Sequence, residues 1–311
     1  MDLSIVICTH NRASELEKTL SSLKGCGGRE ADQVEILVVS NASTDGTEDV
    51  CDRAGVQCVA ESRLGLSHAR NKGIEVAKGD AILWLDDDVT LQAGLVETYL
   101  AALLAFPDHA FFGGPIEPVF EGAPPHWVEP AMASIPTVWS HLDYGGADRT
   151  LSPERNEYPF GANMLIRRRA LGDGFRTDLG RSSSTLVGGE ETALLRSLAE
   201  RGERGRWVAA AKVWHRIGRD RQNLAYIARY FEGYGIESEI LSDGEPRGFD
   251  WTSLAGHSKI GRRWLRYLRK RMTADPAQWL RIYADLNIAR GRRIAQRRKQ
   301  ALNASNRGAR S

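Results

Sequence analysis

Short apolar runs alternate with amphipathic patterns through the first hundred residues, and this alternation most constrains the fold. The apolar runs are short and mostly rich in β-branched residues, as in buried strands, and they fall at 3–8, 34–39, 56–60 and 81–85. Between and after them, Leu and other apolar residues recur at helical spacing. Helices are predicted from a capping box at Ser14 and Glu17, at 66–77 and at 95–106. This order favours an α/β fold with a mostly parallel sheet flanked by helices.

Polar segments follow three of the predicted strands, at 9–12, 40–47 and 86–88. The carboxyl ends of parallel strands lie at one edge of a sheet, and ligands bind beyond that edge. The three segments are therefore expected to meet at a single crevice.

The third segment consists of three consecutive carboxylates, Asp86, Asp87 and Asp88. Carboxylates crowded at a strand end repel one another unless a hard divalent cation, Mn²⁺ or Mg²⁺, gathers their oxygens. Such an ion usually accompanies a phosphate group. A solvated turn is the alternative interpretation, since charged turns are common.

The alternation ends after residue 106, and the Pro-rich segment 121–127 marks a change of architecture. Later elements are predicted as strands at 163–167 and 207–214 and helices at 190–201 and 223–240. We predict one domain over 1–258, with a first half to about 115 and a second half over 116–258, followed by a tail at 259–311.

Composition indicates an ordinary soluble protein, with 42% hydrophobic and 26% charged residues among 311. No basic leader precedes the first strand, and no eighteen apolar residues follow one another, so neither a signal peptide nor a membrane span is expected. The four cysteines lack the spacing of a zinc site or a disulfide framework. We expect reduced thiols and a cytoplasmic location.

The tail carries sixteen Lys or Arg against two Asp, whereas the preceding residues carry 26 basic and 38 acidic side chains. Trp264, Leu265, Leu268 and Met272 recur near helical spacing among these cations. This pattern is typical of a cationic amphipathic helix pair, and we predict peripheral attachment of 259–311 to an anionic membrane surface. Packing of the tail on the acidic body is an open alternative. A nucleic-acid partner is not expected, because the tail has no recognised nucleic-acid module.

Six motifs, in order, resemble those of a family 2 glycosyltransferase. They are SIVICTHNR at 4–12, NASTDGT at 41–47, ARNKG at 69–73, LDDD at 85–88, GANM at 161–164 and GGEE at 188–191. The resemblance covers about residues 3–240, and the order of the motifs makes it specific. It implies a GT-A fold, a nucleotide-diphosphate-sugar donor (UDP, GDP or dTDP), Mn²⁺ or Mg²⁺, and inversion at the anomeric carbon. It also implies a sugar or lipid-linked acceptor, in surface polysaccharide or glycoconjugate biosynthesis.

The same resemblance assigns roles to residues. Thr9 matches the position that seats the nucleotide base, Arg70 a base or phosphate contact, and Asp86 the carboxylate that faces the ribose. Asp88 and His215 match the metal site. The full set expected to bind the donor is Thr9, Asn11, Arg12, Ser40, Asn41, Arg70, Asp86, Asp87 and Glu190.

Glu191 stands where family members usually carry the Asp that deprotonates the acceptor hydroxyl, so the resemblance makes Glu191 the catalytic base. Capping of a helix is the alternative use of this acid. Ser40 is a second departure, because many members have Asp there to receive the N3 hydrogen of uracil. A hydroxyl accepts less strongly than a carboxylate, which leaves UDP less secure as the donor.

Other interpretations remain open. A catalytically silent nucleotide-sugar sensor or scaffold would bind the donor without turnover. A nucleotidyltransferase or a dinucleotide oxidoreductase is disfavoured, because no glycine-rich phosphate loop follows the first strand. Arginines after His215 either clamp phosphate or lie on the surface, namely Arg216, Arg219 and Arg221. Aromatic residues of the middle segment either stack on an acceptor sugar or belong to the core, namely Trp127, Trp139, Tyr144 and Tyr158.

Overall fold

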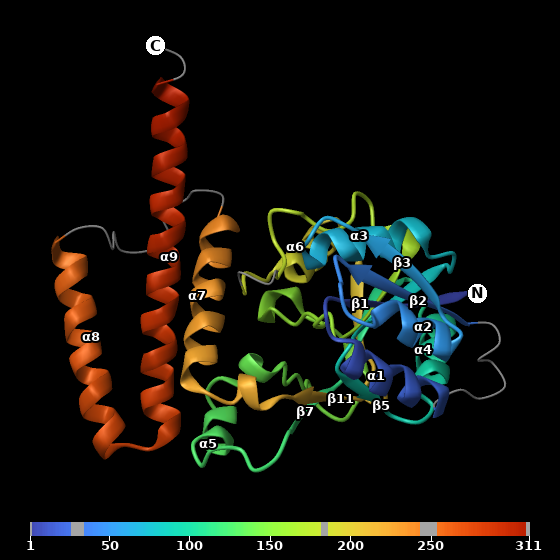
Figure 1. The fold of residues 1–311 in the computed structure, drawn as a ribbon, viewed down its shortest axis with the longest axis horizontal. Helices are drawn as coiled ribbons and strands as arrows, with labels where there is room; N and C mark the ends of the chain where they lie inside the picture. Colours follow the sequence, from blue (N-terminus) through green and yellow to red (C-terminus); the bar gives the residue numbers. More distant parts are fainter. Residues whose placement is uncertain (1, 26–33, 182–185, 243–253, 309–311) are drawn as a thin grey trace. The chain divides into compact units, whose positions relative to one another are not determined.

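The computed structural model describes residues 2–25, 34–181, 186–242 and 254–308, and its ribbon is drawn in Figure 1. The chain divides into two compact units. The first unit comprises Met1–Glu121, Trp139–Gly180 and Glu190–Ile217. The second unit comprises Gly122–Val138, Arg181–Gly189 and Gly218–Ser311. The predicted boundaries at 115 and 258 stay predictions.

An eight-stranded sheet forms the centre of the first unit, in the order β3-β2-β1-β4-β9-β6-β10-β8. Its strands are β1 (Leu3–Thr9), β2 (Val34–Asn41), β3 (Gln57–Glu61), β4 (Ala81–Asp86), β6 (His109–Gly113), β8 (Arg149–Thr150), β9 (Asn163–Arg167) and β10 (Arg204–Trp207). Strands β3, β2, β1 and β4 are parallel neighbours, and β10 runs parallel to β6. Antiparallel β9 joins β4 to β6. The predicted mostly parallel sheet is confirmed.

A second sheet of three strands lies in the same unit, in the order β5-β11-β7. Its strands are β5 (Val89–Leu91), β7 (Ile116–Phe120) and β11 (Val213–Ile217). The prediction of one strand over 207–214 is therefore wrong. β10 ends at Trp207 in the large sheet, and β11 begins at Val213 in the small one. Between them the Ala211 amide donates to the Val208 carbonyl, and this turn carries the chain from one sheet to the other.

Helices flank the large sheet, as the alternation predicted (Figure 1). Those of the first unit are α1 (Ala13–Gly25), α2 (Thr47–Ala54), α3 (Leu66–Val76), α4 (Leu95–Ala105) and α6 (Glu190–Glu200). The predicted capping box at Ser14 is wrong, because α1 already begins at Ala13. Asp45 supplies the cap instead, since its carboxylate accepts a hydrogen bond from the Ala13 amide at 2.9 Å.

The second unit is helical. It contains α5 (Val128–Met132), α7 (Leu224–Ile240), α8 (Leu254–Thr273) and α9 (Pro276–Gly308). Helices α7 and α9 approach closely through glycines, because a Cβ on Gly291 would lie only 1.9 Å from the Glu232 carbonyl oxygen. The helical part of the tail prediction is confirmed. Among the described residues, the helices are too short or too polar to cross a membrane.

The described residues also form short 3₁₀ turns, at Pro136–Trp139, Pro153–Arg155, Arg168–Ala170 and Arg219–Arg221. Of the aromatic residues considered as acceptor contacts, Trp139 and Tyr158 are buried and belong to the core. The described cysteines, Cys8, Cys51 and Cys58, are free thiols, in line with the sequence.

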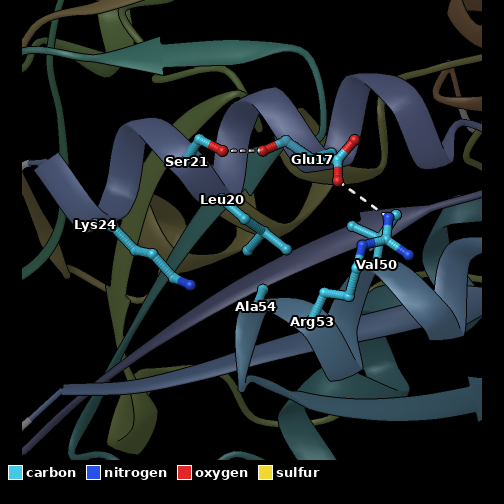
Figure 2. A pocket seen from close by; sticks show the side chains of 7 residues that line it. All are labelled: Glu17, Leu20, Ser21, Lys24, Val50, Arg53 and Ala54. Carbon is cyan, nitrogen blue, oxygen red and sulfur yellow. Dashed lines mark hydrogen bonds and ion pairs between the residues drawn. The ribbon is translucent and has the colours of Figure 1, made fainter.

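A small pocket lies between α1 and α2 (Figure 2). It holds about 100 Å³ and is lined by Glu17, Leu20, Ser21, Lys24, Val50, Arg53 and Ala54. An ion pair of 3.0 Å between Arg53 and Glu17 lies beside it. Sites for ligands of drug size measure roughly 300 to 1,000 Å³. This pocket is therefore too small for a sugar nucleotide.

Candidate active site at the carboxyl edge of the sheet

The three polar segments predicted to meet do meet. Asn11 follows β1, and its side-chain oxygen accepts a hydrogen bond from the Thr44 amide after β2 at 2.7 Å. Arg12, in the same loop, donates to Asp88 after β4 at 2.7 Å. The backbone at Asn11 is left-handed, with φ of 52°, which asparagine tolerates better than most residues. The carboxyl ends of β1, β2 and β4 thus form one edge.

Asp86, Asp88 and His215 form a cluster at this edge, with one ligand atom from each lying within 4.8 Å of the others. The small sheet brings them together. β11 pairs with β5 so that His215 lies opposite Val89, the residue after Asp88. His215 Nε2 lies 2.9 Å from Asp88 Oδ1. Two carboxylates and an imidazole are donors that suit Mn²⁺, so the residues present fit a divalent ion.

Asp87 is not part of that cluster. Its carboxylate accepts a hydrogen bond from the Thr9 hydroxyl at 2.6 Å and pairs with the Arg12 guanidinium at 3.1 Å. Burial, with the Asp88 charge adding to it, raises the pKa of Asp87 to about 7, although Arg12 opposes the shift. Asp87 and Asp88 are both buried, so the interpretation of the triplet as a solvated turn is wrong.

Arg216 was predicted either to clamp phosphate or to lie on the surface, and the structure gives it another task. Its guanidinium donates to the carbonyls of Val89 and Glu15, at 2.6 and 3.0 Å, and to the Thr19 hydroxyl at 2.9 Å. Its backbone amide donates to the Asp88 carbonyl at 2.8 Å. Arg216 therefore ties α1 and β11 to the turn that carries the carboxylates. Only its place directly after His215 hinted at this role.

Ser40 and Asn41, at the end of β2, are both buried. The side-chain amide of Asn41 makes three hydrogen bonds to nearby backbone groups. Its nitrogen donates to the carbonyls of Glu61 and Arg63, and its oxygen accepts from the Gly65 amide. Asn41 thus fixes the start of α3, while its own carbonyl lies 2.7 Å from His10 Nδ1. The structure keeps Ser40 at the strand end where the sequence placed it.

Arg70 joins α3 to α6 through two carboxylates. It pairs with Glu190 at 2.6 Å and with Glu191 at 3.3 Å. Burial disfavours the Arg70 charge, but the Glu191 and Glu190 carboxylates outweigh burial and raise its pKa. Glu191 also accepts a hydrogen bond from the Gly161 amide at 3.3 Å. Gly161 leaves room for Arg70, because a Cβ at 161 would lie 1.8 Å from the guanidinium and would displace it.

The two acids differ in exposure. The Glu190 side chain is 1% exposed, and that of Glu191 is 19% exposed. Glu190 Oε2 is buried and has no hydrogen-bond partner among the described residues. Burial, and then the neighbouring Glu191 charge, raise the pKa of Glu190 to about 8, while Arg70 opposes the shift. Glu191 is therefore the acid of the pair that reaches solvent.

The raised pKa of Glu190 predicts a pH dependence of stability. The folded protein binds this proton more tightly than the unfolded chain, so the contribution is complete below about pH 4.5 and is lost as the pH rises to about 8. One such proton changes the unfolding free energy by at most about 1.4 kcal/mol per pH unit. Glu190→Gln is expected to flatten this fall in guanidinium denaturation between pH 5 and 8.

Glu200→Gln is the matched control, because Glu200 ends the same helix and is exposed. That variant is expected to keep the slope of the wild-type protein. Equal slopes for Glu190→Gln and the wild-type protein would contradict a raised pKa.

Comparisons with known proteins show similarity to glycosyltransferases in sequence and in fold. Residues 4–175 match the model of glycosyl transferase family 2. Glucosyl-dolichyl phosphate glucuronosyltransferase of Haloferax volcanii is 25% identical over 250 residues, which cover 75% of this chain and 76% of the relative. Pre-mycofactocin glycosyltransferase of Mycobacterium tuberculosis is 28% identical over 220 residues, covering 69% of this chain and only 42% of that longer relative.

A solved structure with the same fold is a mannosyltransferase of Pyrobaculum calidifontis in complex with GDP-Man and Mn²⁺. It aligns with a TM-score of 0.60 at 18% identity, over 93% of this chain and 85% of the other. The architecture is thus that of a GT-A glycosyltransferase. Since the family match spans more than half of the sequence and includes most of the large sheet and the carboxylate turn, this protein belongs to glycosyl transferase family 2.

Proposed function

We propose that this glycosyltransferase is a metal-dependent, inverting enzyme that moves a sugar from a nucleotide-diphosphate donor to an acceptor hydroxyl. One observation carries the proposal, namely that a divalent-ion donor set and a partly exposed carboxylate occur together in the first unit. Asp86, Asp88 and His215 would hold the ion. When bound, the ion supplies positive charge against the diphosphate that departs.

The reaction is a single displacement at the anomeric carbon. The acceptor oxygen forms a bond to that carbon as the bond to the diphosphate oxygen breaks, and the nucleoside diphosphate leaves with the electron pair. Glu191 takes the proton of the acceptor hydroxyl. Attack opposite the departing group inverts the configuration. Arg70 keeps the Glu191 carboxylate oriented, because its guanidinium donates a hydrogen bond to the carboxylate.

The donor is a nucleotide sugar carrying UDP, GDP or dTDP. Ser40 stands where many family members have Asp, which weakens the argument for uracil. The mannosyltransferase with the same fold was solved with GDP-Man, which supports testing GDP-sugars first. The acceptor is a sugar or a lipid-linked sugar, and the name of the Haloferax relative, with its glucosyl-dolichyl phosphate, supports the lipid-linked class.

Nucleotide release tests this function. Purified full-length protein is incubated with UDP-, GDP- and dTDP-sugars and a panel of free and lipid-linked sugars, with Mn²⁺, with Mg²⁺ or with EDTA. We expect release from one nucleotide class only, loss of release with EDTA, and a product of inverted anomeric configuration by NMR. A product of retained configuration would overturn the single displacement. Binding of donor and ion without release of nucleotide in the presence of any acceptor would point to a sensor.

A further inference from the structure

Helix α8 carries an exposed apolar stripe. Trp264, Leu265, Leu268 and Met272 are 42, 69, 53 and 87% exposed. At about 100° per residue, these four side chains fall within one arc of about 100° on the helix. They make up half of the large exposed hydrophobic residues in the described part of the chain. Clustered exposed apolar surface of this kind indicates a binding surface.

The stripe has a fixed orientation in its unit, because the adjoining side of α8 packs on α9. Tyr267 is buried and stacks on Tyr283 with ring centroids 5.1 Å apart. The Tyr267 and Trp279 rings lie 6.1 Å apart. This aromatic packing holds Tyr267 against α9, with the edge of Trp264 beside Tyr283, and leaves Leu265, Leu268 and Met272 exposed.

Charge on α8 has one sign. The helix contains seven Lys or Arg and no Asp or Glu. Helical spacing places Arg271 on one side of the stripe and Arg269, Arg262 and Arg266 on the other, and all four are exposed. An apolar stripe bordered by cations on both sides matches the order of a bilayer surface, where anionic phosphates lie above the acyl chains.

We propose that α8 binds the surface of a bilayer that contains anionic lipids. The helix lies parallel to the surface, with Leu265, Leu268 and Met272 among the upper acyl chains and Trp264 at the headgroup level. The bordering arginines lie beside lipid phosphates. This attachment does not depend on the proposed chemistry of transfer, because it uses residues of the second unit only.

The apolar stripe favours a bilayer over a nucleic acid. Binding of a nucleic acid uses cations and flat rings on which bases stack. Leu265, Leu268 and Met272 provide neither, and a duplex or single strand would leave their surface in contact with water. The cations alone do not separate the two partners, so the test rests on the leucines.

Sedimentation with vesicles tests the attachment, using full-length protein and vesicles of phosphatidylcholine alone or with 30 mol% phosphatidylglycerol. Leu265→Gln and Leu268→Gln remove apolar area without changing charge. Leu104→Gln is the matched control, because Leu104 is 71% exposed on α4 of the first unit. Circular dichroism confirms that each variant is folded, and binding of a 20-nucleotide RNA is measured by fluorescence anisotropy.

We expect the wild-type protein to bind only the vesicles with phosphatidylglycerol, and binding to weaken as NaCl is raised. Each α8 variant is expected to lower the partition coefficient by about tenfold, and Leu104→Gln by less than about twofold. Equal binding by the α8 variants and the wild-type protein would overturn the proposal. Equal binding to both kinds of vesicle would also overturn it. Tight binding of the RNA by a protein that sediments with neither kind of vesicle would do the same.

Discussion

Replacing Glu191 by glutamine is expected to lower kcat for transfer by about 10² to 10⁴, the usual contribution of a general base. Glutamine has nearly the shape of glutamate but does not take a proton from the acceptor hydroxyl. The donor KM is expected to stay within a few fold, because the change affects the acceptor side of the reaction. Steady-state kinetics with the donor identified by nucleotide release would measure both constants.

The geometry explains why the base is assigned to Glu191 and not to Glu190. Glu191 is partly exposed and is held by Arg70 and the Gly161 amide, both at 3.3 Å. Glu190 is fully buried, and burial raises its pKa. A fully buried acid is out of reach of an incoming hydroxyl.

Glu191→Asp is the matched variant, since it keeps the carboxylate and shortens the side chain by one methylene. Family members usually have Asp here, and we expect this variant to retain far more activity than Glu191→Gln. If glutamine at 191 left kcat unchanged, another residue would be the base.

Replacing Asp88 by asparagine is expected to weaken Mn²⁺ binding by at least about 100-fold and to abolish transfer at low micromolar Mn²⁺. Asp88 lies in the cluster with Asp86 and His215. Asparagine keeps nearly the same side-chain shape but lacks the negative charge of the carboxylate. Titration calorimetry, or the EPR signal of free Mn²⁺, would measure affinity directly and without any donor. The buried positions around Asp88 make circular dichroism a necessary check of folding.

Asp87→Asn separates the metal cluster from its neighbour in the triplet. The Asp87 carboxylate faces Thr9 and Arg12 and lies outside the cluster, so this variant is expected to bind Mn²⁺ much more tightly than Asp88→Asn. Equal losses in the two variants would show that the triplet acts only through its total charge. Wild-type affinity in Asp88→Asn would remove Asp88 from the metal site.

Much of the first unit was predictable because local pattern and tertiary environment agree there. β1, β2 and β4 are buried apolar runs, and each polar segment that follows marks the edge of the sheet. The family motifs lie on those same segments, which is why most candidate residues fall at one edge. The sequence shows such strands as short continuous apolar runs, because most of their residues are buried.

Other features depend on contacts that periodicity does not contain. The run 207–214 is apolar except for Lys212, and the turn at Ala211 divides it between two sheets. Asp87 and Asp88 are identical neighbours in the sequence, but Asp87 accepts a hydrogen bond from Thr9 whereas Asp88 pairs with His215, which β11 brings beside the turn. The task of Arg216 depends on carbonyl groups of α1 and β5, which no side-chain pattern records.

Because β11 of the small sheet carries His215, the Asp86, Asp88 and His215 cluster can form only after β11 has been synthesised. Asp86 and Asp88 are made early, but their partner His215 arrives on β11, beyond the end of the family match at 175. A nascent chain that stops before His215 therefore has the two carboxylates without the imidazole or the Arg216 hydrogen bonds. Prematurely terminated chains would contain β1, β2 and β4 and yet lack a complete Asp86, Asp88 and His215 cluster, so this cluster depends on synthesis of the chain through β11.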